Sequence, residues 1–192
     1  MKKFLSYIIV LILIGCSNSV RMGTGVDITF DPRTIGMQID DEIMQKSLKS
    51  KIFLIDAKYA VTITIEVLDG RIFLSGDVDD PETKIQITKH AWETKGVRSV
   101  KNLLTIKGDT KFKTNVQDGL ITTQLRTALI LDKKTKSRNY TLETINQNVY
   151  IFGIAMDKDE KKKVIEKANS IYDVKKVIPS IYLVSELSRN QN

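Results

Sequence analysis

Apolar residues recur with a helical period at two places along the chain. In each place, three of them stand four positions apart: Met44, Leu48 and Ile52, then Ile121, Leu125 and Leu129. A spacing near 3.6 residues puts each set on one face of a helix. The pattern therefore predicts two amphipathic helices, each with one buried face.

A pair of β-branched and aromatic runs follows each predicted helix. The runs cover residues 61–67 and 72–76, then 140–145 and 149–153. Asp69-Gly70 joins the first pair, and Asp-Gly between such runs is typical of a hairpin turn. Asn146-Gln147 joins the second pair as a weaker turn of the same length. Each pair therefore predicts a β-hairpin.

Charged residues then begin a second helix after each hairpin. Asp80 and Asp157 stand at the N-cap positions, where a carboxylate accepts backbone N–H bonds and suits the helix dipole. We expect these helices to bury small and branched residues, Ile87 with Ala91 and Val164 with Ala168. A last strand is predicted over residues 100–106 and again over 177–184.

These two series of elements are one pattern repeated at an offset of 77 residues without a gap. The aligned pairs include Asp41 with Asp118, Thr64 with Thr141, Gly76 with Gly153, Asp80 with Asp157, and Ala91 with Ala168. We predict an α+β fold of two tandem modules, at residues 38–107 and 114–184. Each has the order α-β-β-α-β, and a crossover helix makes its last strand parallel to the second. Two helices would cover a three-stranded mixed sheet whose strand order stays open. Because so small a module has a marginal core, we expect the modules to pack together.

The amino-terminal residues indicate export. A cationic start, Met1-Lys2-Lys3, precedes an apolar run over residues 4–14 that is too short to span a bilayer comfortably. This is typical of a secretory signal peptide, assigned here to residues 1–15. Leu13-Ile14-Gly15-Cys16 resembles the lipobox of bacterial lipoproteins, which implies acylation of Cys16. The alternative is an ordinary cysteine beside an uncleaved anchor. As Cys16 is the only cysteine, the chain has no internal disulfide.

Two segments flank the modules. Residues 23–40 lack a clear period and contain Gly, Pro and Thr, so we interpret the segment before the first module, residues 16–37, as a lipidated tether. The stretch from Asp31 to Asp41 is a candidate for docking this tether onto the first module. Residues 185–192 are interpreted as a polar tail, loose from Ser188 onward.

The order α-β-β-α-β, with Gly76 and Gly153 near the end of the second strands, resembles the BON domain. The stretches at residues 31–41 and 121–126 further resemble outer-membrane lipoproteins of the DolP type, which carry two BON domains. The resemblance implies binding of anionic phospholipid through the first helix of the second module, near residues 119–131, and support of envelope integrity. In similar lipoproteins an aspartate after the acylated cysteine implies retention at the inner membrane, but this chain has Ser17 there. The resemblance therefore implies an outer-membrane lipoprotein that faces the periplasm, with surface display as the alternative.

The charge distribution agrees with an anionic partner. Residues 16–107 contain 13 Lys plus Arg and 13 Asp plus Glu, whereas residues 108–192 contain 15 and 10. Basic residues cluster just after the suspected helix: Lys133, Lys134, Lys136 and Arg138. Near an anionic bilayer each contributes about 1 kcal/mol of attraction. The alternative is a solvated loop that keeps the protein soluble.

Helical geometry selects the candidate site. Leu120 and Ile130 lie away from the buried stripe of their helix, so we expect them to be exposed beside Arg126, as on an interfacial helix. The alternative is that they pack against the other module. The predicted lipid-binding residues are Leu120, Thr123, Arg126, Thr127, Ile130, Lys133 and Lys134.

Other function classes have little support. The only histidine, His90, has no paired nucleophile in sight, so we expect no catalytic residues. Asp77, Asp79 and Asp80 are close together, but they stand at a strand-to-helix junction where capping explains Asp80. We therefore expect no metal site and no cofactor. No stacking pattern or motif indicates nucleic acid. The chief alternative function is a structural module that binds an envelope assembly partner or peptidoglycan.

Overall fold

The computed structural model describes residues 31–108 and 112–188, with side chains from residue 116 onward in the second range. Residues from Asp31 onward form one compact unit. The first module consists of α2 (Ile35–Ile55), α3 (Tyr59–Thr62), β1 (Thr64–Leu68), β2 (Arg71–Val78), α4 (Pro81–Trp92) and β3 (Ser99–Ile106). The second consists of α5 (Phe112–Leu131), η2 (Ser137–Asn139), β4 (Tyr140–Ile145), β5 (Asn148–Ala155), α6 (Lys158–Asn169), β6 (Lys176–Leu183) and η3 (Val184–Glu186).

Both modules have the same three-stranded sheet. The strand orders are β1-β2-β3 and β4-β5-β6, a point that the sequence left open. The first two strands of each sheet are antiparallel, whereas the second and third are parallel. The α+β prediction of two α-β-β-α-β modules with mixed sheets is thus confirmed.

A buried aspartate holds each hairpin turn. Both turn residues of the first hairpin, Asp69 and Gly70, have positive φ, as a type I′ turn requires. The carboxylate of Asp41 on α2 accepts the two backbone N–H groups of this turn at 2.8 and 2.9 Å. Asp118 on α5 accepts the corresponding pair at 2.7 Å each. This shared role explains why Asp41 and Asp118 align in the repeat.

A glycine in each central strand permits a close approach of backbone. Gly76 has a φ of 128°, and a Cβ there would lie 2.8 Å from the carbonyl oxygen of Thr62. At Gly153 a Cβ would collide with the carbonyl oxygen of Asn139. A side chain at either position would push the central strand away from the segment that precedes its hairpin.

Each module has a hydrophobic core between its sheet and its helices. In the first, the core includes Leu48, Ile52, Ile72, Leu74, Ile87 and Ala91. In the second, it includes Leu125, Leu129, Val149, Ile151, Val164 and Ala168. The apolar helix positions predicted from the repeat are therefore buried, and the carboxylates of Asp80 and Asp157 cap α4 and α6 as expected.

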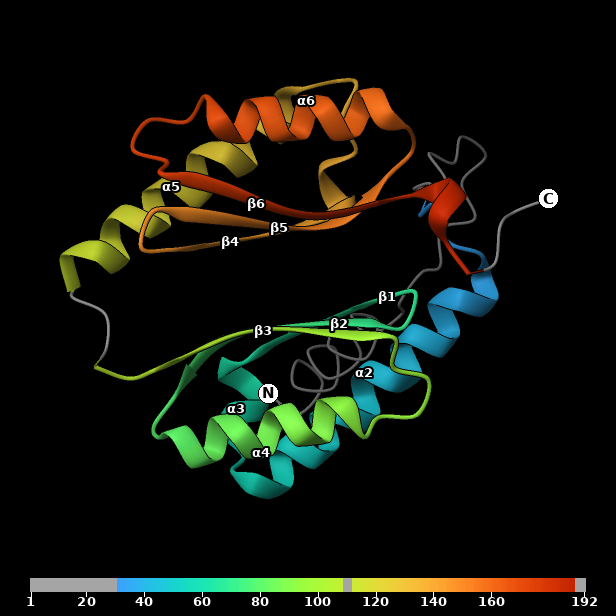
Figure 1. The fold of residues 1–192 in the computed structure, drawn as a ribbon, viewed down its shortest axis with the longest axis vertical. Helices are drawn as coiled ribbons and strands as arrows, with labels where there is room; N and C mark the ends of the chain where they lie inside the picture. The colour runs from blue at the N-terminus through green and yellow to red at the C-terminus, as the bar shows by residue number, and fades with distance from the viewer. Residues whose placement is uncertain (1–30, 109–111, 189–192) are drawn as a thin grey trace, which may run out of the picture. The chain divides into compact units, whose positions relative to one another are not determined.

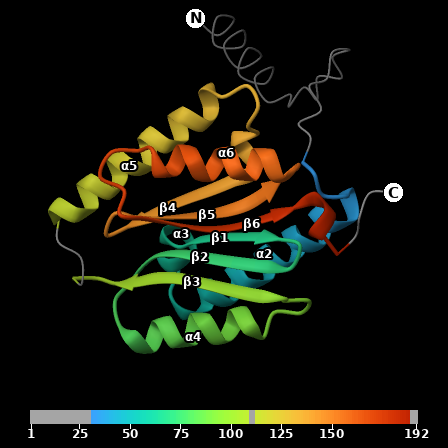
Figure 2. The same ribbon diagram turned by 45° about the horizontal axis from the view of Figure 1, so that its top comes forward.

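The two sheets pack face to face, with helices on both outer sides. Figures 1 and 2 show α5 and α6 over one sheet and α2, α3 and α4 under the other. The rings of Phe73 on β2 and Phe152 on β5 stack with centroids 5.3 Å apart, and Tyr182 meets Phe152 edge-on at 6.4 Å. The described residues are therefore arranged as a four-layer helix–sheet–sheet–helix sandwich, which agrees with the expected packing of the modules.

The structure corrects two local assignments. Helix α2 begins at Ile35, so residues 35–37 of the expected tether are helical, because the Thr34 hydroxyl caps the helix by accepting from the Met37 N–H. Residues 61 and 62, expected in a strand, belong to the short helix α3, which places Tyr59 in the core. Both errors arise where a cap or a packed neighbour overrides the local pattern.

The start of α2 and the segment at Leu187 and Ser188 meet beside the first hairpin. Arg33 donates to Asp31, to Asp41 at 2.7 Å and to the Val67 carbonyl, so the stretch before α2 docks on the first module. Met37 and Leu187 are buried in one small cluster with Ile154. The predicted polar tail is thus partly packed, and Ser188, expected to be loose, hydrogen-bonds to Asp69.

Candidate functional site

Helix α5 has an apolar stripe on its outer face. Its exposed apolar side chains are Val116 (50% exposed), Leu120 (57%), Ile130 (62%) and Leu131 (76%). At 100° per residue they lie opposite the core positions Ile121, Leu125 and Leu129. Leu120 and Ile130 are therefore exposed, as helical geometry predicted, and neither packs into the other module. A helix that is apolar on its outer face as well as its core face is unusual for a solvated element.

The predicted polar site residues lie on or beside this stripe. Thr123 and Thr127 are exposed, and their hydroxyls donate to the carbonyls of Gly119 and Thr123 at 2.8 and 2.9 Å. These bonds satisfy the hydroxyls within the helix, so the threonines add little polarity to the stripe. Arg126 is exposed on the flank. The structure thus brings Leu120, Thr123, Thr127 and Ile130 onto one face.

Lys133 and Lys134 follow the carboxyl end of α5 and are exposed. The neighbouring carboxylate, Asp132, accepts the Lys134 backbone N–H at 2.9 Å and pairs with Lys167 of α6 at 3.3 Å. These bonds hold the pKa of Asp132 below its usual value. The side chain of Asp132 is thus paired with Lys167 and not with the side chain of Lys133 or Lys134. Lys133 lies only two residues beyond the last apolar residue of the stripe.

A groove opens at the other end of the stripe. It has a volume of about 600 Å³, and α5 and the loop before β6 line it with Val116, Gln117, Leu120, Ile121, Gln124, Tyr172 and Asp173. Gln117 donates to Asp173 at 2.6 Å and thereby joins the two walls. Tyr172 is largely exposed. The sequence did not point to Tyr172, because only the fold brings that loop beside α5.

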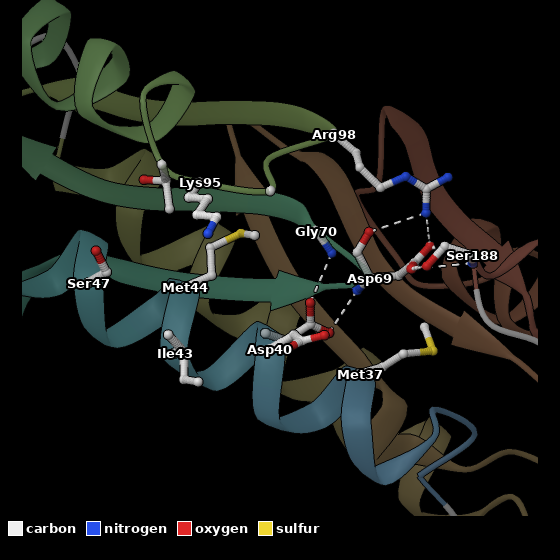
Figure 3. A pocket seen from close by; sticks show the side chains of 13 residues that line it. Met37, Asp40, Ile43, Met44, Ser47, Asp69, Gly70, Lys95, Arg98 and Ser188 are labelled. Carbon is white, nitrogen blue, oxygen red and sulfur yellow. Dashed lines mark hydrogen bonds and ion pairs between the residues drawn. The ribbon is translucent and has the colours of Figure 1, made fainter.

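The first module has a cavity in the corresponding place (Figure 3). Its volume is about 590 Å³, and Ile43, Met44, Ser47 and Lys95 in its lining align with four lining residues of the groove at the 77-residue offset. Here, however, Asp69 receives hydrogen bonds from Arg98 and Ser188. Burial alone would raise the pKa of Asp69, but the bonds from Ser188 and Arg71 and the charge of Arg98 lower it. A charged cluster therefore occupies this place, whereas the second module has an apolar groove.

The other candidate residues have structural partners. Asp79 pairs with Lys58 and with Lys107 at 2.8 Å, Asp80 caps α4, and Asp77 accepts from Thr105. Within residues 31–108 and 112–188, no three His, Cys, Asp or Glu side chains gather as a metal site would require. His90 lies on α4, 3.5 Å from Glu93.

Cys16, the predicted acylation site, and the predicted signal peptide lie outside the described residues. In the part of the chain that is described, no helix has both the length and the apolar character to cross a membrane.

Two duplicated α-β-β-α-β modules, each with a mixed sheet and one outer helical layer, define the class of protein. The family model for the BON domain matches residues 40–108 and 117–183, so the chain belongs to the BON domain family and has two such domains. It is similar to the outer membrane lipoprotein DolP of Haemophilus influenzae, with 28% identity over 172 residues and 88% of each chain covered. The resemblance to a two-domain, DolP-like protein is thus confirmed.

The chain also matches two further proteins. An uncharacterized protein encoded in the gshII 5′ region of Anaplasma centrale is 29% identical over 154 residues, covering 80% of this chain and 95% of that one. Among solved structures, CdsD, a structural protein of the type III secretion system of Chlamydia trachomatis, matches with 13% identity and a TM-score of 0.32. That match covers 71% of this chain and 91% of the other.

Proposed function

We propose that this protein is an outer-membrane lipoprotein, anchored through acylated Cys16 and facing the periplasm, that binds anionic phospholipid through α5 and supports envelope integrity. On this proposal it is a binding protein, not an enzyme. The observation that carries the proposal is the exposed apolar stripe of α5 next to exposed lysines. The similarity to DolP supports the location and the anchor.

The charges of α5 favour an anionic surface. From Val116 to Leu131 the only acidic residue is Asp118, which is buried and holds the hairpin turn. The outer face of α5 therefore presents no carboxylate to lipid phosphates. Arg126 on its flank and Lys133 and Lys134 at its end supply positive charge. Apolar insertion and attraction to headgroups are the two terms by which an interfacial helix binds a membrane.

The architecture also leaves this face accessible. Helix α5 belongs to an outer layer of the sandwich, on the far side of its sheet from the other module (Figure 1). A bilayer can therefore approach the stripe without separating the modules. The groove beside Leu120, which Tyr172 also lines, has a volume of about 600 Å³ and can take part of an acyl chain or headgroup.

Vesicle co-sedimentation of a chain that begins at Ser17 tests the proposal, because residues from Asp31 onward form a compact unit with both cores. Replacing Leu120 and Ile130 together with Glu removes two apolar contacts, about 1 kcal/mol each when half of each side chain is buried. It also adds two negative charges, and the anionic headgroups repel each by about 1 kcal/mol. We expect affinity for phosphatidylglycerol vesicles to fall about a thousandfold, with unchanged thermal stability.

The matched control is Val61→Glu with Ile85→Glu. Both residues are exposed and apolar, but they lie on α3 and α4 of the first module. We expect this variant to bind vesicles nearly like the wild type. Equal loss in both variants would show that added negative charge alone matters and would overturn the assignment to α5. Binding of the wild type only to peptidoglycan or a protein partner would favour the structural function instead.

A further inference from the structure

Helix α2 repeats the outer apolar stripe of α5, residue for residue. At the 77-residue offset, four exposed apolar residues of one helix align with four of the other: Ile39 with Val116, Ile43 with Leu120, Phe53 with Ile130, and Leu54 with Leu131. Ile35 extends the stripe to the first turn of α2. Every one of these side chains on α2 is more than half exposed. The first module therefore also presents an apolar helix face without a partner among the described residues.

The two stripes lie on opposite outer sides of the sandwich. The sheets form the two inner layers, and α2 and α5 belong to different outer layers (Figures 1 and 2). A flat bilayer in contact with the outer face of α5 therefore lies on the far side of the molecule from the outer face of α2. The stripe of α2 needs a different occupant.

The charges of α2 distinguish it from α5. Its amino-terminal half contains Asp40 and Glu42, whose counterparts in α5 are the uncharged Gln117 and Gly119. Its carboxyl-terminal half contains the basic residues Lys46, Lys49 and Lys51. The stripe is thus acidic toward one end and basic toward the other. An anionic bilayer would repel the acidic half, whereas an identical helix running in the opposite direction would match both halves.

We propose that α2 is a homodimer interface, on which the outer face of α2 from a second copy of this chain packs antiparallel, with the twofold axis crossing the helix at the level of residue 44. An interface of this kind is self-complementary, because each residue meets its partner twice. In this register Glu42 of one copy meets Lys46 of the other, and Ile35 meets Phe53. The antiparallel direction also opposes the two helix dipoles.

The pairing needs no rearrangement of the fold. In the single chain Glu42 and Lys46 pair within the helix at 2.7 Å, and both side chains are largely exposed. Such exposed pairs hold their partners weakly, so exchanging them for pairs between copies loses little. The gain comes from covering the five apolar side chains of the stripe. The interface depends only on α2 and does not require that α5 bind lipid.

Sedimentation equilibrium of the chain that begins at Ser17 tests the proposal. We expect the wild type to reach twice the monomer mass as its concentration rises. Ile43→Glu is expected to remain a monomer. Its matched control is Leu120→Glu, the counterpart on α5, which is expected to dimerise like the wild type. The same two variants are expected to behave in the reverse way with phosphatidylglycerol vesicles, so failure of one proposal is distinguishable from failure of the other.

Two charge variants test the antiparallel register. Asp40→Lys with Glu42→Lys makes the exposed charges of α2 basic throughout, and Lys46→Glu, Lys49→Glu and Lys51→Glu together make them acidic throughout. Each variant alone is expected to stay monomeric, and a 1:1 mixture is expected to restore the dimer mass, with circular dichroism confirming that both are folded. A wild type that is monomeric at every concentration, a dimer that survives Ile43→Glu, or a mixture that stays monomeric would each overturn the proposal.

Discussion

The contact between the two sheets makes a quantitative prediction for Phe152→Ala. Phe152 is 1% exposed and stacks on Phe73, which is equally buried. Removing a buried phenylalanine side chain lowers the free energy of unfolding by about 3 to 5 kcal/mol. The lost ring stacking accounts for about 0.5 to 1.5 kcal/mol of this change. We therefore expect Phe152→Ala to lower the free energy of unfolding by about 4 kcal/mol.

Urea denaturation followed by circular dichroism measures this loss. With a slope of about 2 kcal/mol per molar urea, the midpoint should fall by about 2 M. A double-mutant cycle with Phe73→Ala isolates the contact between the modules, and residues in contact couple by at least about 0.5 kcal/mol. If the two substitutions are additive, or if Phe152→Ala costs less than about 1 kcal/mol, the sheets do not stack in solution. The opposite placement of α2 and α5 would then lose its basis.

Two further predictions concern carboxylates, the half-buried Glu143 and the buried Asp69. Burial and the charges of Asp77 and Asp118 raise the pKa of Glu143, despite a hydrogen bond from Ser75. Folding therefore favours the protonated carboxyl group over the charged one. The folded protein loses this stability as pH rises above 4.5, the value in the unfolded chain. Glu143→Gln should therefore raise the Tm by a few degrees at pH 7 and hardly at all at pH 4, and an equal gain at both pH values would contradict this reasoning. Asp69→Asn should destabilise the fold by about 3 kcal/mol at pH 7, since it breaks a buried charged cluster. Because the pKa of Asp69 is lowered from 3.8, the stability from its charge is present above that pH and lost as pH falls below it, so melting curves of wild type and variant should converge only in strong acid.

The fold was predictable where the same physical requirement occurs twice. Asp41 and Asp118 each hold a turn, and Gly76 and Gly153 each allow a close backbone approach, so the repeat identified both modules. Strand order was not predictable, because it depends on how the crossover helix returns the chain. The helical turn at residues 61 and 62 was missed because burial of Tyr59 overrides a strand-like local sequence.

The candidate site was predictable only within one helix. Helical phase placed Leu120 and Ile130 outside the core, and they are exposed. The groove beside them was missed, since Tyr172 comes from a loop distant in sequence. The same holds for Ser188, whose bonds to Asp69 join residues 119 positions apart. The stripe of α2 did have a sequence signal, the matching apolar residues at the 77-residue offset, but only exposure in the fold separates them from core positions.

The most direct test of the proposed function is the dependence of vesicle binding on headgroup charge. The chain that begins at Ser17 is mixed with phosphatidylcholine vesicles that contain increasing fractions of phosphatidylglycerol, at low and at high salt. We predict that the bound fraction rises with phosphatidylglycerol content and falls as salt screens the attraction. Binding that is absent from anionic vesicles, or that is equal on purely zwitterionic ones and insensitive to salt, would contradict a lipid-binding face on α5.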